Sequence, residues 1–361
     1  MVAAVASSWA LFIGIALMML GNGLQGSLLG IRASLEGFPT TLTGVLMSGY
    51  YAGFLVGSVL APKLVARVGH VRVFAALASL ASSAILVHLL WIDPASWTAI
   101  RLVTGFCYAG LYVVVESWLN DQASNETRGQ LLSAYMVVVL GGAAGGQGLL
   151  NLADPSGSKL FILVSILVSL SLIPLLLSTG RTPPFETPAP VGIRQLWRVS
   201  PTGVVGYFGT VMAHGACFGM GAVYGRAIGL SVRDISVFMS LILLGGMLLQ
   251  WPIGRLSDAW DRRQVLTAVT LMAALCAVLA SLAAGRSLLG LLALTALFGG
   301  MSLPLYSLCI AHTNDHLTRD QRVQGSRPCD LTGKSKAFSD QCFPRVRVRG
   351  SNRVARRAGR C

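Results

Sequence analysis

The chain contains 361 residues, of which 54% are hydrophobic and only 12% are charged, and its mean hydropathy is +0.67. Because soluble domains carry about 25% charged residues, this composition excludes an ordinary soluble enzyme, a disordered chain and a secreted disulfide scaffold. The net charge is +14, but the segment Arg322–Cys361 alone contributes +9. The high isoelectric point therefore does not indicate nucleic-acid binding. The composition favours a protein whose main solvent is lipid.

Ten apolar stretches follow one another along the chain, each near the length of about 20 residues that crosses the hydrocarbon core of a bilayer. Glycine and proline within them are compatible with membrane helices, because neighbouring helices satisfy the freed backbone groups. The chain is therefore predicted to be an all-α membrane protein. The predicted spans are Trp9–Ile31, Leu42–Ala61, Val73–Ile92, Trp97–Leu119, Leu131–Leu152, Leu160–Ser178, Gly203–Tyr224, Ile235–Ile253, Val265–Ala284 and Leu288–Ala311.

Basic residues are distributed unequally between the loops on the two sides. Ten lie in loops on the side of the N-terminus: Lys63, Arg67, Arg72, Arg128, Arg181, Arg194, Arg198, Arg255, Arg262 and Arg263. Five lie on the opposite side: Arg32, Lys159, Arg226, Arg233 and Arg286. The positive-inside rule then predicts a cytoplasmic N-terminus. A Pro-rich connector at residues 179–200 separates six spans from four and is typical of a cytoplasmic linker.

Two loop segments form an internal repeat. Pro62–Arg72 reads PKLVARVGHVR, Gly254–Arg263 reads GRLSDAWDRR, and they superpose at an offset of 192 in the numbering, with Gly69 on Asp261. The pairs Asn120-Asp121 and Asn314-Asp315 repeat at an offset of 194. Such a repeat predicts two parallel six-span units, the second of them incomplete.

With these motifs the chain resembles the major facilitator superfamily, and the Glu116–Asp121 run ESWLND is similar to its YcaD-like branch. The family's signature G-x-x-x-D-R-x-G-R-R is best matched in the second copy, at Gly254, Asp258, Arg262 and Arg263. The first copy keeps Arg67, Gly69 and Arg72, but has Pro62 and Ala66 where Gly and Asp are expected. Arg101–Gly105 is similar to the family's helix-four motif, and the glycines at 141, 145, 146 and 148 to its helix-five motif without the proline.

The resemblance implies a bundle of twelve helices, about ten of which are present. Its parts would be an N-terminal six-helix bundle at 1–178, the linker at 179–200 and an incomplete C-terminal bundle at 201–321. It implies a monomeric secondary transporter of the bacterial inner membrane that exports a small molecule by proton-coupled alternating access. No cofactor, metal or nucleic-acid partner is expected. Walker A and common hydrolase motifs are missing from the sequence, so an enzyme is not predicted.

Two alternatives stay open. A bundle of the same architecture could act as a receptor or sensor that binds a ligand without moving it. The chain could also be an inactive, truncated transporter. The run 322–361 is rich in Arg and has no apolar span, which suggests either a frameshifted reading frame or a basic tail attracted to anionic lipids.

A polar face is predicted on the fourth span. At 100° per residue, Arg101, Tyr108, Tyr112 and Glu116 fall within about 80° of one another. Charges within a span are functional candidates by default, so Arg101 would bind an anion or adjust a proton site, and Glu116 would carry the coupling proton. Alternatively, Arg101 extends outward to the interface and Glu116 only caps a gate.

Three further groups of residues have candidate roles. Asn22 and Gln25 share a face of the first span, where they could bind substrate or join helices. The signature residues Arg67, Gly69, Arg72, Gly254, Asp258, Arg262 and Arg263 would form a cytoplasmic gate whose ion pairs cross between the halves, or would be topology charges. Close helix packing is expected at Gly49, Gly53, Gly57, Gly105, Gly141 and Gly145.

Overall fold

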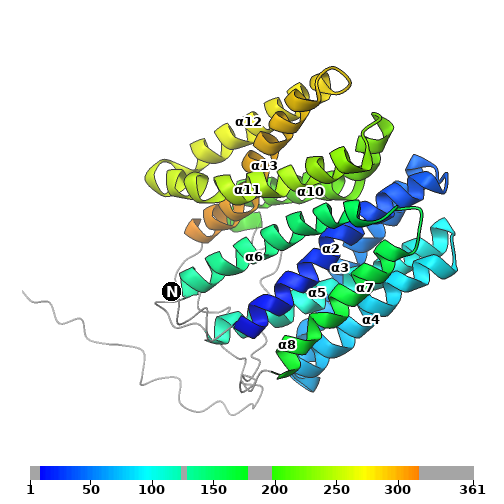
Figure 1. The fold of residues 1–361 in the computed structure, drawn as a ribbon. Helices are drawn as coiled ribbons and strands as arrows, with labels where there is room; N and C mark the ends of the chain where they lie inside the picture. Colours follow the sequence, from blue (N-terminus) through cyan, green and yellow to red (C-terminus); the bar gives the residue numbers. More distant parts are fainter. Residues whose placement is uncertain (1–8, 123–127, 178–196, 317–361) are drawn as a thin grey trace, which may run out of the picture. The chain divides into compact units, whose positions relative to one another are not determined.

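A computed structural model describes residues 9–122, 128–177 and 197–316, all within one compact unit. These residues form helices and no strand (Figure 1). The predicted linker, apart from residues 197–200, and the tail from residue 322 lie outside the described residues. The helices are α2 (Trp9–Leu35), α3 (Thr40–Val68), α4 (His70–Leu90), α5 (Pro94–Gln122), α6 (Arg128–Gly148), the 3₁₀ turn η1 (Leu149–Leu152), α7 (Lys159–Leu170), α8 (Leu172–Leu177), α10 (Pro201–Ala227), α11 (Val232–Ala259), α12 (Arg262–Ala283) and α13 (Leu288–His316).

The helix boundaries reproduce the repeat that the loop motifs predict. An offset of 192 in the numbering carries both ends of α2 onto the ends of α10, and the first residues of α3 and α4 onto those of α11 and α12. An offset of 194 carries both ends of α5 onto the ends of α13. The helices α2 to α5 and α10 to α13 are therefore equivalent sets, here called the N half (with α6 to α8) and the C half.

The helix ends follow from local sequence chemistry. Gly37 and Gly229, equivalent positions of the repeat, follow α2 and α10 with φ of 72° and 84°, a left-handed conformation that glycine adopts without strain. Gly69 makes the turn from α3 to α4 in the same way, with φ of 92°. Its repeat equivalent Asp261 has φ of −59° and instead caps α12, accepting a hydrogen bond from the Arg263 N–H at 2.8 Å.

One helix crossing occurs twice and holds each half together. In the N half, a Cβ added at Gly53 would overlap the Leu102 carbonyl of α5, and one at Gly105 would overlap the Tyr50 carbonyl of α3. In the C half, Gly245 meets the Ala296 carbonyl and Gly299 meets the Ile242 carbonyl. All four contact positions correspond by the two offsets of the repeat. Only glycine allows backbones to approach this closely in a membrane, where tight packing drives helix association.

Glycines of α6 show where the packing prediction was wrong. A Cβ at Gly141 would meet nothing within 4 Å, and one at Gly145 would meet only the Leu20 side chain. The close approach to the α2 backbone falls one residue later, at Gly142 and Gly146. The spacing of four is right, but the register is shifted because α6 presents the next face of its helix to α2.

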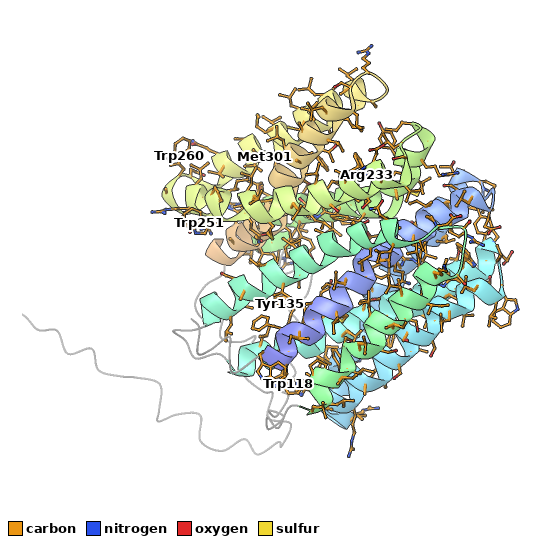
Figure 2. All side chains as sticks on the ribbon, viewed as in Figure 1. Trp118, Tyr135, Arg233, Trp251, Trp260 and Met301 are labelled. Atoms are coloured by element: carbon orange, nitrogen blue, oxygen red, sulfur yellow. The ribbon has the colours of Figure 1, made fainter. Side chains whose placement is uncertain are left out.

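The surface of the described residues suits lipid. Nine of the described helical segments are long and apolar enough to cross a membrane, with α7 and α8 forming one of them. The predicted seventh span is also a helix, α10, but its many glycines and His214 lower its hydropathy below that of the others. Figure 2 shows Trp251 and Trp260, which are 70% and 66% exposed, toward one end of α11 and Arg233 at the other. Exposed tryptophans near helix ends are typical of membrane interfaces.

We predict that Gly53→Ala and Gly245→Ala each lower the free energy of unfolding by about 1–3 kcal/mol, the usual cost of overpacking. Each new methyl group would have to displace a backbone carbonyl of the facing helix. Thermal unfolding of the purified protein in detergent micelles measures the effect.

Gly141→Ala is the matched control. It has open space and gains up to about 1 kcal/mol of helix propensity, so its melting temperature should be unchanged or higher. Equal melting temperatures for all three variants would contradict the role of the glycine crossings.

Candidate functional site: a cavity between the two halves

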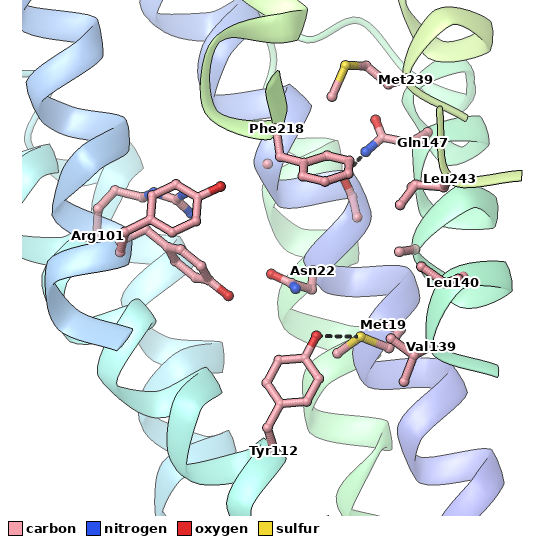
Figure 3. Close-up of a pocket in the computed structure, with 15 residues that line it drawn as sticks. Met19, Asn22, Arg101, Tyr112, Val139, Leu140, Gln147, Phe218, Met239 and Leu243 are labelled. Carbon is pink, nitrogen blue, oxygen red and sulfur yellow. Dashed lines mark hydrogen bonds between the residues drawn. The ribbon is translucent and has the colours of Figure 1, made fainter. Parts of the chain in front are cut away.

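A cavity of about 230 Å³ lies between the N half and the C half. Figure 3 shows Arg101 on one side of it, Asn22 and Tyr112 facing it, and Phe218 and Gln147 across from Arg101. Six helices contribute to the wall, two of them from the C half. The lining residues are Met19, Asn22, Gly23, Gly26, Tyr50, Tyr51, Arg101, Tyr112, Val139, Leu140, Ala143, Gln147, Phe218, Met239 and Leu243.

Arg101 is held inside the protein. The side chain is 5% exposed, and its guanidinium carbon lies 4.5 Å from the centroid of the Tyr50 ring. A cation over an aromatic face is stabilised by the ring quadrupole. The alternative in which Arg101 extends outward to the membrane interface does not describe this structure, because the side chain lines the cavity.

Polar groups of α2, α5 and α6 complete the wall. The Gln147 amide donates to the Gly23 carbonyl at 2.9 Å, and its oxygen accepts from the Ser27 hydroxyl at 2.6 Å. The Tyr112 hydroxyl contacts the Met19 sulfur at 3.1 Å, and Asn22 lies beside Tyr50 and Tyr112. Sequence reasoning missed Gln147, although a glutamine within an apolar span is a signal that could have been used.

Two residues predicted for the pathway lie elsewhere. Tyr108 is 0% exposed and packs behind Tyr50 at a centroid distance of 6.2 Å, and it does not line the cavity. Gln25 is 1% exposed and also does not line it. Both corrections have one cause: helical periodicity assigns a face, but the neighbouring helix covers part of that face.

Glu116 lies two turns beyond Tyr108 on α5, toward the end where α2 begins. Its carboxylate accepts a hydrogen bond from the Tyr135 hydroxyl of α6 at 3.1 Å. Tyr306 of the C half is close enough to interact with it electrostatically. Glu116 is exposed, and its interactions with Tyr135 and Tyr306 connect it to both halves.

The halves meet at one end of the cavity, which we call the outer end because the charge rule predicts it to be extracytoplasmic. There, the Ser236 hydroxyl donates to the Gln147 carbonyl at 2.6 Å and accepts from the Asn151 amide at 3.0 Å. The Ser240 hydroxyl donates to the Ala144 carbonyl at 3.0 Å. One apolar core joins the N half to Ile235, Phe238 and Met239 of the C half, among other residues.

At the other end, called the inner end, the described residues of the two halves separate. The C half has its own small core there, made of Ile253, Val265, Leu266, Val269, Leu305, Leu308 and Cys309. A groove of about 630 Å³ lies between α6 and α11, lined among others by Met136, Trp251 and Asp258. Leu140 lines both this groove and the central cavity, so the two spaces adjoin.

The membrane helices form two repeats with a polar cavity between them. This architecture is typical of secondary transporters, and the sequence identifies the family. It matches the family model of the Major Facilitator Superfamily over residues 11–325. The chain belongs to the Major Facilitator Superfamily. It is therefore a multi-pass membrane transporter and not an enzyme.

Curated relatives support this membership. The chain is 29% identical over 315 residues to the "Uncharacterized MFS-type transporter YcaD" of Escherichia fergusonii, covering 86% of this chain and 80% of the relative. It is 30% identical over 261 residues to the YcaD of Salmonella arizonae, covering 71% and 68%. The predicted resemblance to the YcaD-like branch is thereby confirmed.

Solved structures share the superfamily fold at low sequence identity. The nucleoside transporter NupG matches with a TM-score of 0.67 at 13% identity, covering 88% of this chain and 85% of that one. A bacterial homologue of the human lysosomal transporter Spinster, in an inward-facing and unoccupied conformation, matches with a TM-score of 0.65 at 13% identity, covering 89% and 78%.

The superfamily's signature residues lie at the inner end. Asp258 pairs with Arg262 at 2.9 Å, and Arg262 also donates to the Ser257 hydroxyl at 3.1 Å. This ion pair joins α11 to α12 within the C half, whereas the sequence predicted a pair that crosses to the N half. Arg67 and Arg72 are exposed, and neither forms an ion pair with a residue whose side chain the structure describes. The difference has a physical reason, because the groove separates Asp258 from the N half.

We predict that Ser236→Ala shifts the equilibrium between states with an open and a closed inner end toward the closed state. Each hydrogen bond contributes about 1 kcal/mol, and that difference changes a two-state ratio about fivefold. Spin labels at positions 136 and 251, placed in a background without native cysteines, measure the width of the groove. The population with the short distance should grow.

Ser281→Ala is the control, because the Ser281 hydroxyl donates only to the Val278 carbonyl of its own helix. Its distance distribution should match the unmodified protein. If the Ser236→Ala variant also gave the distance distribution of the unmodified protein, its hydrogen bonds would not hold the outer end together.

Proposed function

We propose that the chain is a proton-coupled secondary transporter that exports a small molecule from the bacterial cytoplasm by alternating access. The observation that carries this proposal is a polar cavity shared by both halves, which meet at its outer end and separate at its inner end. A cavity at the interface of two repeats can be exposed to either side by rocking one repeat against the other.

The position of Glu116 supports a role in proton coupling. An exposed carboxylate that interacts with both halves can exchange its proton with water, and its contact with Tyr135 depends on its protonation state. A proton taken up or released there would change the interactions that the N half offers to Tyr306. The protonation state of Glu116 would therefore change how strongly the two halves interact at this position.

The groove at the inner end supports the proposed direction of transport. With the outer end held together, an exporter would take up its substrate through the inner groove. Ten basic residues in the predicted inner loops against five in the outer loops support an inner-membrane orientation with a cytoplasmic N-terminus. Because the cavity is enclosed by residues of a single chain, we propose that the monomer is the transporting unit.

Flux in proteoliposomes tests the function. A panel of radiolabelled organic acids, nucleosides and sugars is screened for movement with and without an imposed pH gradient. We expect at least one compound to accumulate against its own gradient when the pH gradient is present. Binding of a panel compound without any gradient-driven movement would support the receptor alternative, and neither binding nor movement would support the inactive one.

We predict that Glu116→Gln lowers pH-driven accumulation by about tenfold or more, within the range of known coupling free energies. Glutamine preserves the size of the side chain but cannot exchange a proton. Exchange of substrate across the membrane at equal pH should persist, because it requires no net proton movement.

Glu36→Gln is the matched control, since it makes the same change in a carboxylate that pairs with Arg32 outside the cavity. Its pH-driven accumulation should equal that of the unmodified protein. An unchanged pH dependence in Glu116→Gln would remove the coupling role.

We predict opposite labelling of two engineered cysteines, at Val68 near the end of α3 and at Ser156 between η1 and α7. Both positions are exposed, at opposite ends of the N half. In right-side-out vesicles lacking other cysteines, a membrane-impermeant maleimide should label only the Ser156→Cys variant. Labelling of Val68→Cys alone would reverse the proposed orientation.

A further inference from the structure

Arg101 has an unusual environment for a buried cation. No ion pair links it to any residue that the structure describes, and its Nε atom has no hydrogen-bond partner there. A buried membrane charge without a partner costs several kcal/mol. Arg101 lines the central cavity, so a ligand in the cavity has room to pair with its charge.

The cavity wall supplies no compensating negative charge. Among the described residues that line it there is no Asp or Glu, and its polar members are Asn22, Gln147 and three tyrosines. The lining therefore has a formal charge of +1. A ligand that carries one negative charge would neutralise it, whereas a neutral ligand would leave Arg101 unpaired.

The geometry of the Arg101–Tyr50 contact selects how such a ligand is held. The Tyr50 ring centroid lies 4.5 Å from the guanidinium carbon, and a ring stacked on the face of the guanidinium would leave the N–H groups at its edge free to bind a ligand. Those N–H groups match the two oxygens of a carboxylate in a bidentate arrangement. Because the Nε atom is shielded from solvent, the carboxylate would bind the two terminal nitrogens of the guanidinium.

The rest of the wall indicates the body of the ligand. Phe218 and Met239 of the C half and Tyr51 and Tyr112 of the N half surround the space beyond Arg101 with aromatic and thioether groups. Such surfaces bind flat apolar groups. The cavity volume of 230 Å³ is smaller than the roughly 300 Å³ at which pockets for drug-sized ligands begin, which favours a small ligand.

We propose that the substrate is a small organic monoanion, with a carboxylate held edge-on by Arg101 and a flat apolar body enclosed by Tyr51, Tyr112, Phe218 and Met239. The description of this ligand as a substrate rests on the proposed transport function. The binding itself requires neither a proton gradient nor transport, so the two proposals fail in different experiments.

Equilibrium binding in detergent micelles tests the proposal, with benzoate as the anionic probe and benzamide as its neutral match in shape. We expect saturable binding of benzoate by isothermal titration calorimetry at millimolar concentration or below, and at least about tenfold weaker binding of benzamide. Absence of saturable benzoate binding, or equal binding of the two probes, would overturn the assignment. This comparison uses the unmodified protein and does not depend on the folding of any variant.

Variants then locate the binding group. Arg101→Gln should weaken benzoate binding about a hundredfold, the scale for removing one partner of a buried charge pair, and should leave benzamide binding unchanged. Arg101→Lys keeps the charge but loses the planar pair of donors. Its affinity for benzoate should therefore lie between those of the unmodified protein and Arg101→Gln. Benzoate binding that is unaffected in Arg101→Gln would place the anion elsewhere.

One further substitution tests the ring of Tyr50, and another is the matched control. Tyr50→Leu removes the ring that lies against Arg101 and should weaken benzoate binding several-fold. Arg226→Gln removes a cation in the last turn of α10, outside the cavity, and should have no effect. Equal weakening in Arg226→Gln would show a general effect of net charge rather than a site.

Discussion

The close crossing of α3 and α5 is the constraint on which the rest of the N half depends. In a bilayer, helices gain little from apolar burial against one another and associate through tight packing. Gly53 and Gly105 let the carbonyls of Leu102 and Tyr50 reach the facing backbone. Those carbonyls belong to residues next to the site, because Leu102 follows Arg101 directly. The same contact that joins the helices therefore brings the Arg101 guanidinium over the Tyr50 ring.

The C half repeats the glycine crossing but lacks the polar residues found next to it in the N half. Thr295 occupies the position of Arg101 and Ile242 that of Tyr50, although Gly245 and Gly299 meet backbone carbonyls as their counterparts do. The repeat equivalent of Glu116 is Ile310. Duplication thus preserved the backbone packing in both halves, while the charged groups remain in the N half. The C half contributes Phe218 and Met239 as apolar wall.

The fold could be predicted from the sequence more completely than the site. Apolar length and the two loop motifs predict the helices and the repeat, since both depend on local pattern. The cavity depends on which helix covers which face, and a single helix carries no information about that. Hence Arg101 and Tyr112 share the predicted face with Tyr108, yet Tyr108 is buried behind Tyr50. Phe218 and Gln147 could not be assigned to the wall until the facing helices were placed.

The location of the unpaired charge connects binding to conformational change. The outer end is held by hydrogen bonds of Ser236, Ser240 and Asn151 and by a shared apolar core, while the inner end is separated by a groove. Closing the inner end around an empty cavity would bury the unpaired charge of Arg101 more deeply, which adds to its cost. A bound carboxylate removes that cost, so its presence favours closure by the difference in its affinity for the two states. An anion at Arg101 would thereby permit the closed intermediate that alternating access requires, and an empty carrier would pass through it less readily.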